Sequence, residues 1–127
     1  MRELKFRAWI KGYNCYADVL GFEQGKLFVQ FQSGERAQHR LYVPIEDSVL
    51  EQYTSLKDRN GKEIYEGDIV NIQGIKYYVD FEYGGFWFNN DNLKWKANRP
   101  FTHFQEINGT EVVGNVHENA DLMEGEA

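Results

Sequence analysis

Apolar and polar residues alternate along most of this chain, which is the pattern of half-buried β-strands. The first such strand is predicted by four apolar residues that alternate with charged ones: Leu4, Phe6, Ala8 and Ile10. Trp9 falls on the polar face of this strand, so we expect one end of that face to be covered. The same alternation predicts a return strand over 15–20 and a third strand over 26–32, with Gly21 and Gly25 bracketing the turn between them.

The pattern is less regular between residues 36 and 53, and two interpretations stay open there. Pro44 before two acids, with apolar residues at spacing four from Ile45, favours a short helix over 45–52. Alternation over 48–53 favours a strand instead.

The second half of the chain is again typical of short strands separated by turns. Asp58-Arg59-Asn60-Gly61 and Glu66-Gly67-Asp68 predict tight turns, since Asn and Gly accept the positive φ that such turns need. We expect Asp68 to accept hydrogen bonds from nearby backbone N–H groups. Further strands are predicted over 69–72, 76–83, 86–88 and 110–116. Many short strands at this spacing indicate a small barrel or sandwich.

Composition narrows the class of protein. A chain of 127 residues, 42% hydrophobic and 27% charged, favours one globular domain over a disordered segment. One cysteine, Cys15, excludes an internal disulfide and fits a reducing compartment. The sequence holds no apolar run long enough for a membrane helix. We therefore expect a soluble, cytoplasmic protein that makes no membrane contact.

Charge is distributed unevenly along the chain. Six of the 20 acidic residues and none of the 14 basic ones lie in 106–127, which leaves 14 of each sign before that tail. A body without net positive charge argues against nucleic acid as the default partner, although a local basic patch stays compatible with this balance.

Three blocks of the sequence resemble the YopX-like proteins of bacteriophages and prophages. They are Met1–Trp9 (MRELKFRAW), Gln52–Val70 (QYTSLKDRNGKEIYEGDIV) and Glu111–Asn119 (EVVGNVHEN), in the family's order. The resemblance implies a fold that contains an SH3-like β-barrel with further α+β structure. Together with the alternation, it leads us to expect a mainly β fold, an SH3-like β-barrel with additional strands and one short helix. It also implies homo-oligomers, a phage or prophage origin and a place in the bacterial cytoplasm. It supplies no reaction, no catalytic residue and no cofactor.

Two positions depart from the family pattern. Ser55 stands where the family usually has glycine, which suggests a backbone that does not need positive φ there. Ala120 stands where a proline commonly follows the asparagine, and we expect a looser last turn. Within one YopX-like domain, 1–127, we expect N-terminal strands over 1–53, a barrel core over 54–117 and a frayed acidic tail over 118–127.

The sequence contains no group of residues with the spacing of a catalytic or metal-binding site. Cys15 and the three histidines are scattered singly, without the paired short spacings of a zinc site. The glycines never take the spacing of a phosphate-binding loop. Cys15 lies on a predicted strand or turn with no cue for a base beside it, so packing is the simpler role. We expect no metal, no cofactor and no enzymatic activity.

The segment 93–104 carries the strongest candidate chemistry. Lys94, Trp95, Lys96 and Arg99 combine cations with an aromatic ring, as surfaces that bind single-stranded nucleic acids do. The simpler interpretation is that Trp95 and Phe101 pin a long loop while the lysines stay solvated.

A further set of rings exceeds what one face of a small barrel can bury, so we expect a second copy of the chain to cover part of it. That set is Tyr77, Tyr78, Tyr83, Phe86, Trp87 and Phe88. The sequence thus favours a non-enzymatic, self-associating phage accessory protein. The alternatives are a single-stranded nucleic-acid-binding module and an acidic protein that docks on a host enzyme.

Overall fold

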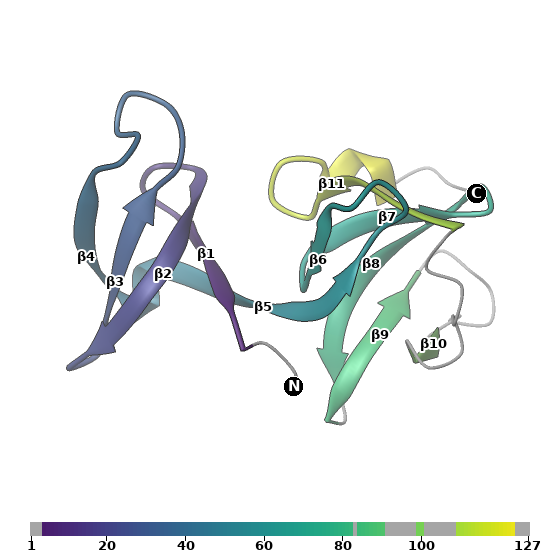
Figure 1. Cartoon of the computed structure of the whole chain (residues 1–127), viewed down its shortest axis with the longest axis horizontal. Helices are drawn as coiled ribbons and strands as arrows, with labels where there is room; N and C mark the ends of the chain where they lie inside the picture. The colour runs from purple at the N-terminus through teal and green to yellow at the C-terminus, as the bar shows by residue number, and fades with distance from the viewer. Residues whose placement is uncertain (1–3, 83, 91–98, 101–108, 124–127) are drawn as a thin grey trace. The chain divides into compact units, whose positions relative to one another are not determined.

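The computed structural model describes residues 4–82, 84–90, 99–100 (backbone only) and 109–123. These residues form two antiparallel sheets (Figure 1), and their helical content is limited to two short 3-10 turns. The mainly β class predicted from the alternation is therefore confirmed. By compactness the chain divides into an N-terminal unit, 1–52, and a C-terminal unit, 53–127.

The N-terminal unit is built on five strands, one of which it shares with the C-terminal unit. They are β1 (Phe6–Ile10), β2 (Cys15–Glu23), β3 (Lys26–Phe31), β4 (Arg40–Pro44) and the first half of β5 (Ser48–Lys57). Their order in the sheet is β4-β3-β2-β1-β5, and each neighbouring pair is antiparallel. The first three strands were predicted, whereas β4 was not.

The segment 45–52 contains both of the structures that its sequence left open. A 3-10 turn, η1, covers Ile45–Asp47, and β5 begins at the next residue, Ser48. The proline before η1 accounts for the helical signal, since proline favours the first turn of a helix. From Ser48 onwards, the alternation of apolar and polar residues correctly predicts a strand.

The short link between β4 and β5 shows that this sheet curls. Four strand spacings separate β4 from β5 in the order of strands, which is roughly 19 Å in a flat sheet. The chain from Pro44 to Ser48 spans at most about 14 Å, and less when it turns as η1 does. The sheet therefore bends, and apolar side chains gather on one of its faces. The core residues there are Ala8, Ile10, Ala17, Leu27, Val29, Phe31 and Val43.

Gly21 does not mark a turn, contrary to the prediction. It lies inside β2 at a shift of register, where Val19 pairs with Val29 and Gly21 pairs with Phe28. Leu20 is the extra residue of this β-bulge. Glycine within a strand often marks such a bulge. A Cβ at Gly21 would meet no described atom within 4 Å, so crowding does not require the glycine here. The turn itself lies at Gln24 and Gly25.

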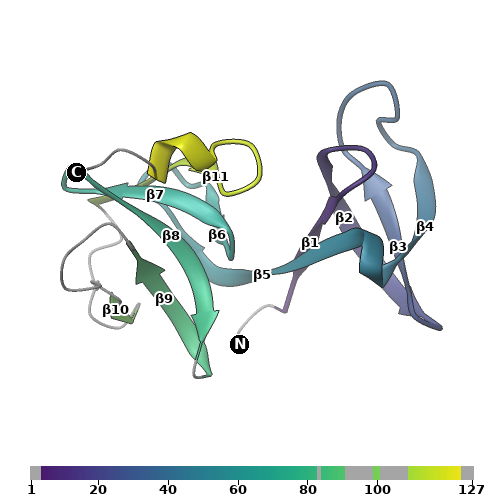
Figure 2. The same cartoon turned by 180° about the vertical axis from the view of Figure 1, so that it is seen from behind.

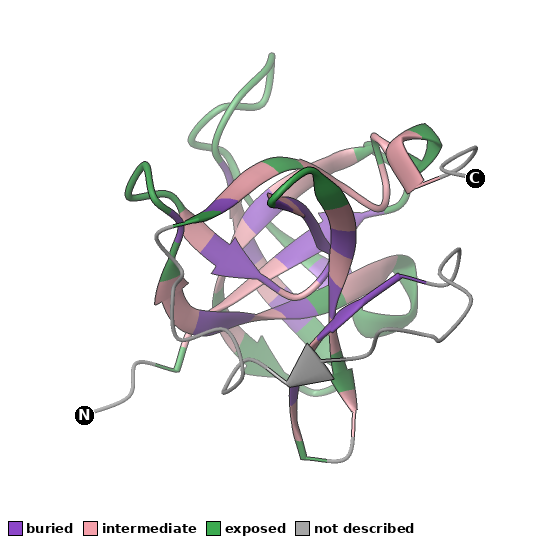
Figure 3. Cartoon of the chain, turned by 90° about the vertical axis from the view of Figure 1, so that its right-hand side faces the viewer, coloured by how far each residue is buried: buried purple, intermediate pink, exposed green. Residues whose placement is uncertain are grey.

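The C-terminal unit contains the remaining strands (Figure 2). The second half of β5 pairs with β6 (Glu63–Tyr65), and a second sheet has the order β10-β9-β8-β7-β11. Its strands are β7 (Asp68–Ile72), β8 (Ile75–Glu82), β9 (Gly85–Asn89), β10 (Arg99–Pro100) and β11 (Thr110–Asn115). Its core combines aliphatic and aromatic residues: Ile64, Val70, Ile72, Tyr77, Val79, Phe86 and Phe88. In Figure 3 most buried positions fall on strands of the two units.

Among the described residues, the strand pairings leave both sheets open. The SH3-like barrel therefore stays a prediction, as does the division into 1–53, 54–117 and 118–127. The expected tail begins in an ordered 3-10 turn, η4 (Ala120–Met123), which lies against β8. Residues 124–127 lie outside the described part of the chain.

Ser55 contradicts the expectation drawn from its family position. Its φ is 71°, in the left-handed region that glycine adopts most easily. The family's glycine therefore has a physical reason here, and this chain places a serine in the same conformation.

Candidate functional site

The basic segment predicted as a binding site lies largely outside the described residues. Lys94, Trp95 and Lys96 fall there, and of Arg99 the structure places only the backbone, paired with Phe88 between β10 and β9. The role predicted for these four residues stays a prediction.

The turn carboxylates of the C-terminal unit hold the backbone. Buried Asp68 accepts a hydrogen bond from the backbone N–H of Tyr65 at 2.7 Å, which confirms the expected turn cap. Asp58 accepts three: from Asn60 and Lys62 in its own turn and, at 2.9 Å, from Val112 on β11. These acids fix turns, so we assign them a structural function.

Burial and hydrogen bonding act in opposite directions on the pKa of Asp58. Desolvation raises this pKa, but the N–H groups of Val112, Lys62 and Asn60, with the positive charge of Lys62, together outweigh it and leave the pKa lowered. The carboxylate is therefore kept ionised by Val112 of β11 and by its own turn.

The rings thought to be in surplus are mostly buried within the chain itself. Tyr77, Phe86 and Phe88 belong to the core of the C-terminal unit, and the half-buried Trp87 donates its indole N–H to the carbonyl of Glu82. Tyr78 is also half-buried, and Tyr83 lies outside the described residues. The expectation that these rings need cover from a second copy is wrong for the three core rings.

Exposed apolar side chains are instead concentrated on the N-terminal unit. Of the large hydrophobic residues that the structure shows exposed, eight lie there: Leu4, Tyr13, Leu20, Phe22, Leu41, Tyr42, Ile45 and Leu50. The C-terminal unit contributes three, Ile75, Phe81 and Val113. Clustered apolar exposure marks interaction surfaces in soluble proteins.

Two neighbouring rings, the half-buried Phe28 of β3 and the exposed Tyr42 of β4, lie on one face of the sheet. We name them, with Glu23, Gln24 and Lys26, the β3–β4 surface. The register pairs Phe28 with Tyr42, and their ring centroids lie 4.8 Å apart. The Tyr42 hydroxyl donates to a Glu23 carboxylate oxygen at 3.1 Å. Tyr42 and the three polar residues line a pocket of about 230 Å³.

The electrostatics of this surface follow from that hydrogen bond. The acceptor role and negative charge of Glu23 raise the pKa of the Tyr42 phenol, so the hydroxyl stays a donor. The Phe28 and Tyr42 rings lie beside the acidic Glu23 and the basic Lys26. Such a surface is suited to bind another protein, because aromatic rings supply contact area at low entropic cost.

The open edge of β4 is short. Phe31 donates to the carbonyl of His39 and accepts from Gln38 at the start of the β3–β4 ladder. The alternation of an antiparallel ladder then turns the main-chain groups of Arg40 and Tyr42 outward. Pro44, two residues further, has no N–H to offer, so this edge does not support a long added strand. Contacts of side chains are the better means of association here.

A second polar cluster lies on the sheet around β1. The Arg7 Nε lies 2.9 Å from Glu51 Oε1, and the Tyr16 hydroxyl donates to the same oxygen at 2.9 Å. The Arg7 guanidinium also lies 4.0 Å from the centre of the Tyr16 ring, and Trp9 packs edge-on against that ring. Trp9 is buried on the polar face, as its sequence position predicted. Because Glu51 is buried and already paired, this cluster is a structural ion pair.

In the part of the chain that the structure describes, no three His, Cys, Asp or Glu side chains lie close enough together to hold a metal ion. Cys15 is half-buried and packs against the N-terminal core, which agrees with the packing role expected for it. No helix in the described ranges has the length and apolarity needed to cross a membrane.

Comparison with known proteins identifies the family. The crystal structure of protein EF1440 from Enterococcus faecalis is similar to this chain, with a TM-score of 0.64 and 23% sequence identity over 98% of this chain and 100% of that one. At this identity the likeness concerns the fold alone. No curated protein matches the sequence. The family model of the YopX protein matches residues 5–124, and the chain therefore belongs to the YopX family.

Proposed function

We propose that this protein is a non-enzymatic binding module that associates with a second copy of itself through the N-terminal unit. The observation that carries the proposal is the apolar exposure of that unit, eight large side chains against three on the C-terminal unit among the described residues. The β3–β4 surface, with the tilted ring pair of Phe28 and Tyr42, is the centre of the proposed contact.

Charge supports self-contact through this unit in particular. Residues 1–52 carry seven basic and seven acidic side chains, whereas 53–127 carry seven basic and thirteen acidic ones. Two C-terminal units would repel each other with a net charge of −6 apiece, and two N-terminal units would meet without net repulsion. The proposed biological setting is the bacterial cytoplasm, as an accessory protein of a phage or prophage.

Sedimentation velocity of the full chain across the micromolar range tests this proposal. We expect the weight-average mass to rise above that of one chain, and Tyr42→Lys to return it to the monomer. Lysine at this exposed position removes the ring from Phe28 and adds a charge that must be desolvated on association.

Phe81→Lys is the matched control, because it places the same charge on an exposed ring position of β8 in the C-terminal unit. It should associate as the unaltered chain does. A monomer at every concentration would contradict the proposal, and so would dissociation caused by Phe81→Lys and not by Tyr42→Lys.

A further inference from the structure

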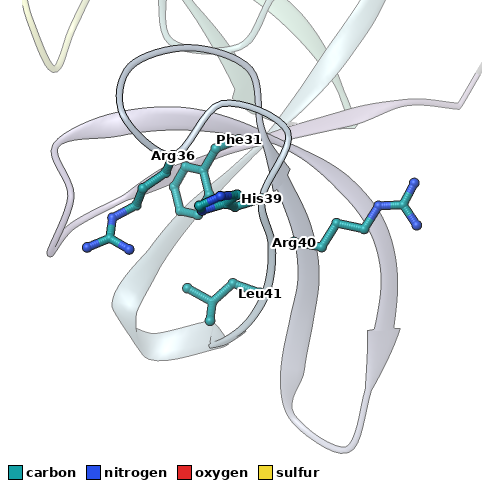
Figure 4. Close-up of a pocket in the computed structure, with 5 residues that line it drawn as sticks. All are labelled: Phe31, Arg36, His39, Arg40 and Leu41. Carbon is teal, nitrogen blue, oxygen red and sulfur yellow. The ribbon is translucent and has the colours of Figure 1, made fainter.

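A second pocket of the N-terminal unit lies where the loop 32–39 joins β3 to β4. It has a volume of about 260 Å³ and is lined by Phe31, Arg36, His39, Arg40 and Leu41 (Figure 4). Phe31 is buried and forms an apolar floor, while the four other residues are exposed. Arg36 adds a positive charge at the rim, whereas Arg40 pairs with Gln30 and so points to the opposite face of the sheet.

The two arginines are held by uncharged groups. The Arg36 guanidinium lies 4.6 Å from the centre of the Tyr13 ring, which packs edge-on against Phe31. The Nε of Arg40 donates to the side-chain oxygen of Gln30 at 3.0 Å, and Gln30 in turn donates to Gln38.

The other arginines whose side chains the structure describes are paired with acids. Arg7 pairs with Glu51 and Arg59 with Glu111, each through a contact shorter than 3 Å. Arg36 and Arg40 make no such pair with a described carboxylate. Their side chains are thus positioned while their charge is left uncompensated, which is the arrangement that favours binding of an external anion.

The directions of these side chains indicate the shape of that anion. In Figure 4 Arg36 and Arg40 extend to opposite sides, and the rings of His39 and Phe31 lie between them. One small anion could not contact both guanidinium groups. A polyanion with a charge at every repeat could contact both, and a planar group between two of its charges could reach the His39 ring.

We propose that this pocket and its two arginines bind single-stranded nucleic acid. The strand crosses the open edge of β4: Arg36 contacts a phosphate on the side of the pocket, Arg40 contacts a phosphate on the other side of the edge, and a base between them stacks on the exposed His39 ring. Stacking rings beside cations is the arrangement by which proteins bind single strands. Glu35 is the acid of the loop, and it weakens the attraction. Arg40 lies on the same face of β4 as Tyr42 of the β3–β4 surface, so a strand bound here would compete with self-association through that surface.

Fluorescence anisotropy of the full chain with an end-labelled oligothymidine of 20 bases, at 50 mM salt, tests the site. We expect salt-dependent binding that the double variant Arg36→Ala/Arg40→Ala weakens at least tenfold. The slope of log K against log salt should become shallower by about 1.4, because each lost phosphate contact on a single strand removes roughly 0.7. Glu35→Gln should tighten binding about twofold, since it removes a negative charge from the rim.

Arg59→Ala is the matched control: it removes one positive charge from an exposed arginine of the C-terminal unit and should leave the affinity within twofold. Circular dichroism melts of all variants establish that each is folded. Absence of binding at 50 mM salt would overturn the proposal, as would binding that is lost with Lys94→Ala/Lys96→Ala but kept in the Arg36→Ala/Arg40→Ala variant. If a polyglutamate peptide displaced the labelled oligothymidine as well as unlabelled oligothymidine does, the pocket would be assigned to acidic proteins. That result would also overturn the proposal.

Discussion

The two units use their buried carboxylates in different ways. In the C-terminal unit, Asp58 and Asp68 accept hydrogen bonds from backbone N–H groups and so fix the turns that shape the sheet. In the N-terminal unit, the buried Glu51 binds side chains, the guanidinium of Arg7 and the hydroxyl of Tyr16. The C-terminal unit therefore uses its acids to fix the main chain, whereas the N-terminal unit uses Glu51 to balance the charge of Arg7.

This difference explains which unit remains available for partners. The C-terminal unit buries most of its described rings and carries the net negative charge of the chain. The N-terminal unit leaves apolar side chains and two uncompensated arginines at its surface. We infer that the first unit supplies stability and the second supplies binding. The predictions below test that contrast.

Asp58→Ala should have the largest effect on stability, a loss of about 3–4 kcal/mol in the free energy of unfolding. Three backbone donors lose a charged acceptor, and the one on Val112 also joins the turn to β11. Urea denaturation followed by circular dichroism measures the loss. Asp121→Ala, on the exposed η4 turn, is the control and should change stability by less than about 0.5 kcal/mol.

The pH dependence sharpens this first prediction. Because the pKa of Asp58 is lowered from 3.8 in the folded chain, its stabilisation is complete above that value and is lost as the pH falls through the lower, folded-state pKa. The stability difference between the unaltered chain and Asp58→Asn should therefore shrink on acidification. A difference that grows at low pH would contradict the role given to the ionised carboxylate.

Glu51→Ala should cost about 2–3 kcal/mol, somewhat less than Asp58→Ala, because Arg7 keeps partial access to water. The double variant Arg7→Met/Glu51→Leu should recover most of the loss, since it removes both charges and keeps apolar volume. Thermal or urea unfolding measures both. If the double variant were as unstable as Glu51→Ala, the pair would not act as a balanced ion pair.

Gly114→Ala should destabilise the C-terminal unit by about 2 kcal/mol. A Cβ at this position would lie 2.6 Å from the side-chain oxygen of Asn119, closer than real contacts allow. Gly109→Ala is a matched control, because a Cβ there meets none of the described atoms within 4 Å. Equal unfolding midpoints for the two alanine variants would show that Asn119 moves aside freely.

Ser55→Gly should have the smallest effect and the opposite sign, a gain of about 0.5 kcal/mol. Glycine relieves the left-handed conformation, and its greater freedom in the unfolded chain offsets part of the gain. Ser48→Gly should instead lower stability, because Ser48 has an extended backbone and its hydroxyl donates to the carbonyl of Ile45. A loss with Ser55→Gly would mean that the serine side chain contributes more than its backbone costs.

The sequence was most informative where one face of a strand is buried and the other is wet. Strands β3 and β8 alternate in this way, whereas β1 and β7 also bury residues on their second face. The turn at Asp58 and the cap at Asp68 followed from residue chemistry. β4 could not be found by alternation, because Val43 is its one fully buried residue. Gly21 shows that a glycine alone does not distinguish a turn from a bulge.

The candidate sites were less predictable, since they depend on how the sheets bend. The capacity for burying rings was underestimated because β6, which adds Ile64 to the core around these rings, was not predicted. Arg36, His39 and Arg40 stand close in sequence, and that spacing was a usable signal. Their uncharged partners, Tyr13 and Gln30, come from other strands and turns, so the uncompensated charge is visible only in the structure.

Hydrogen–deuterium exchange of the full chain at low and high protein concentration tests the contrast between the units most directly. If the N-terminal unit supplies the contact between copies, amides of residues 20–28 and 40–45 should become slower to exchange as the concentration rises, while those of 75–82 stay unchanged. Added protection confined to the C-terminal unit, or none anywhere along the chain, would contradict the assignment of binding to the N-terminal unit.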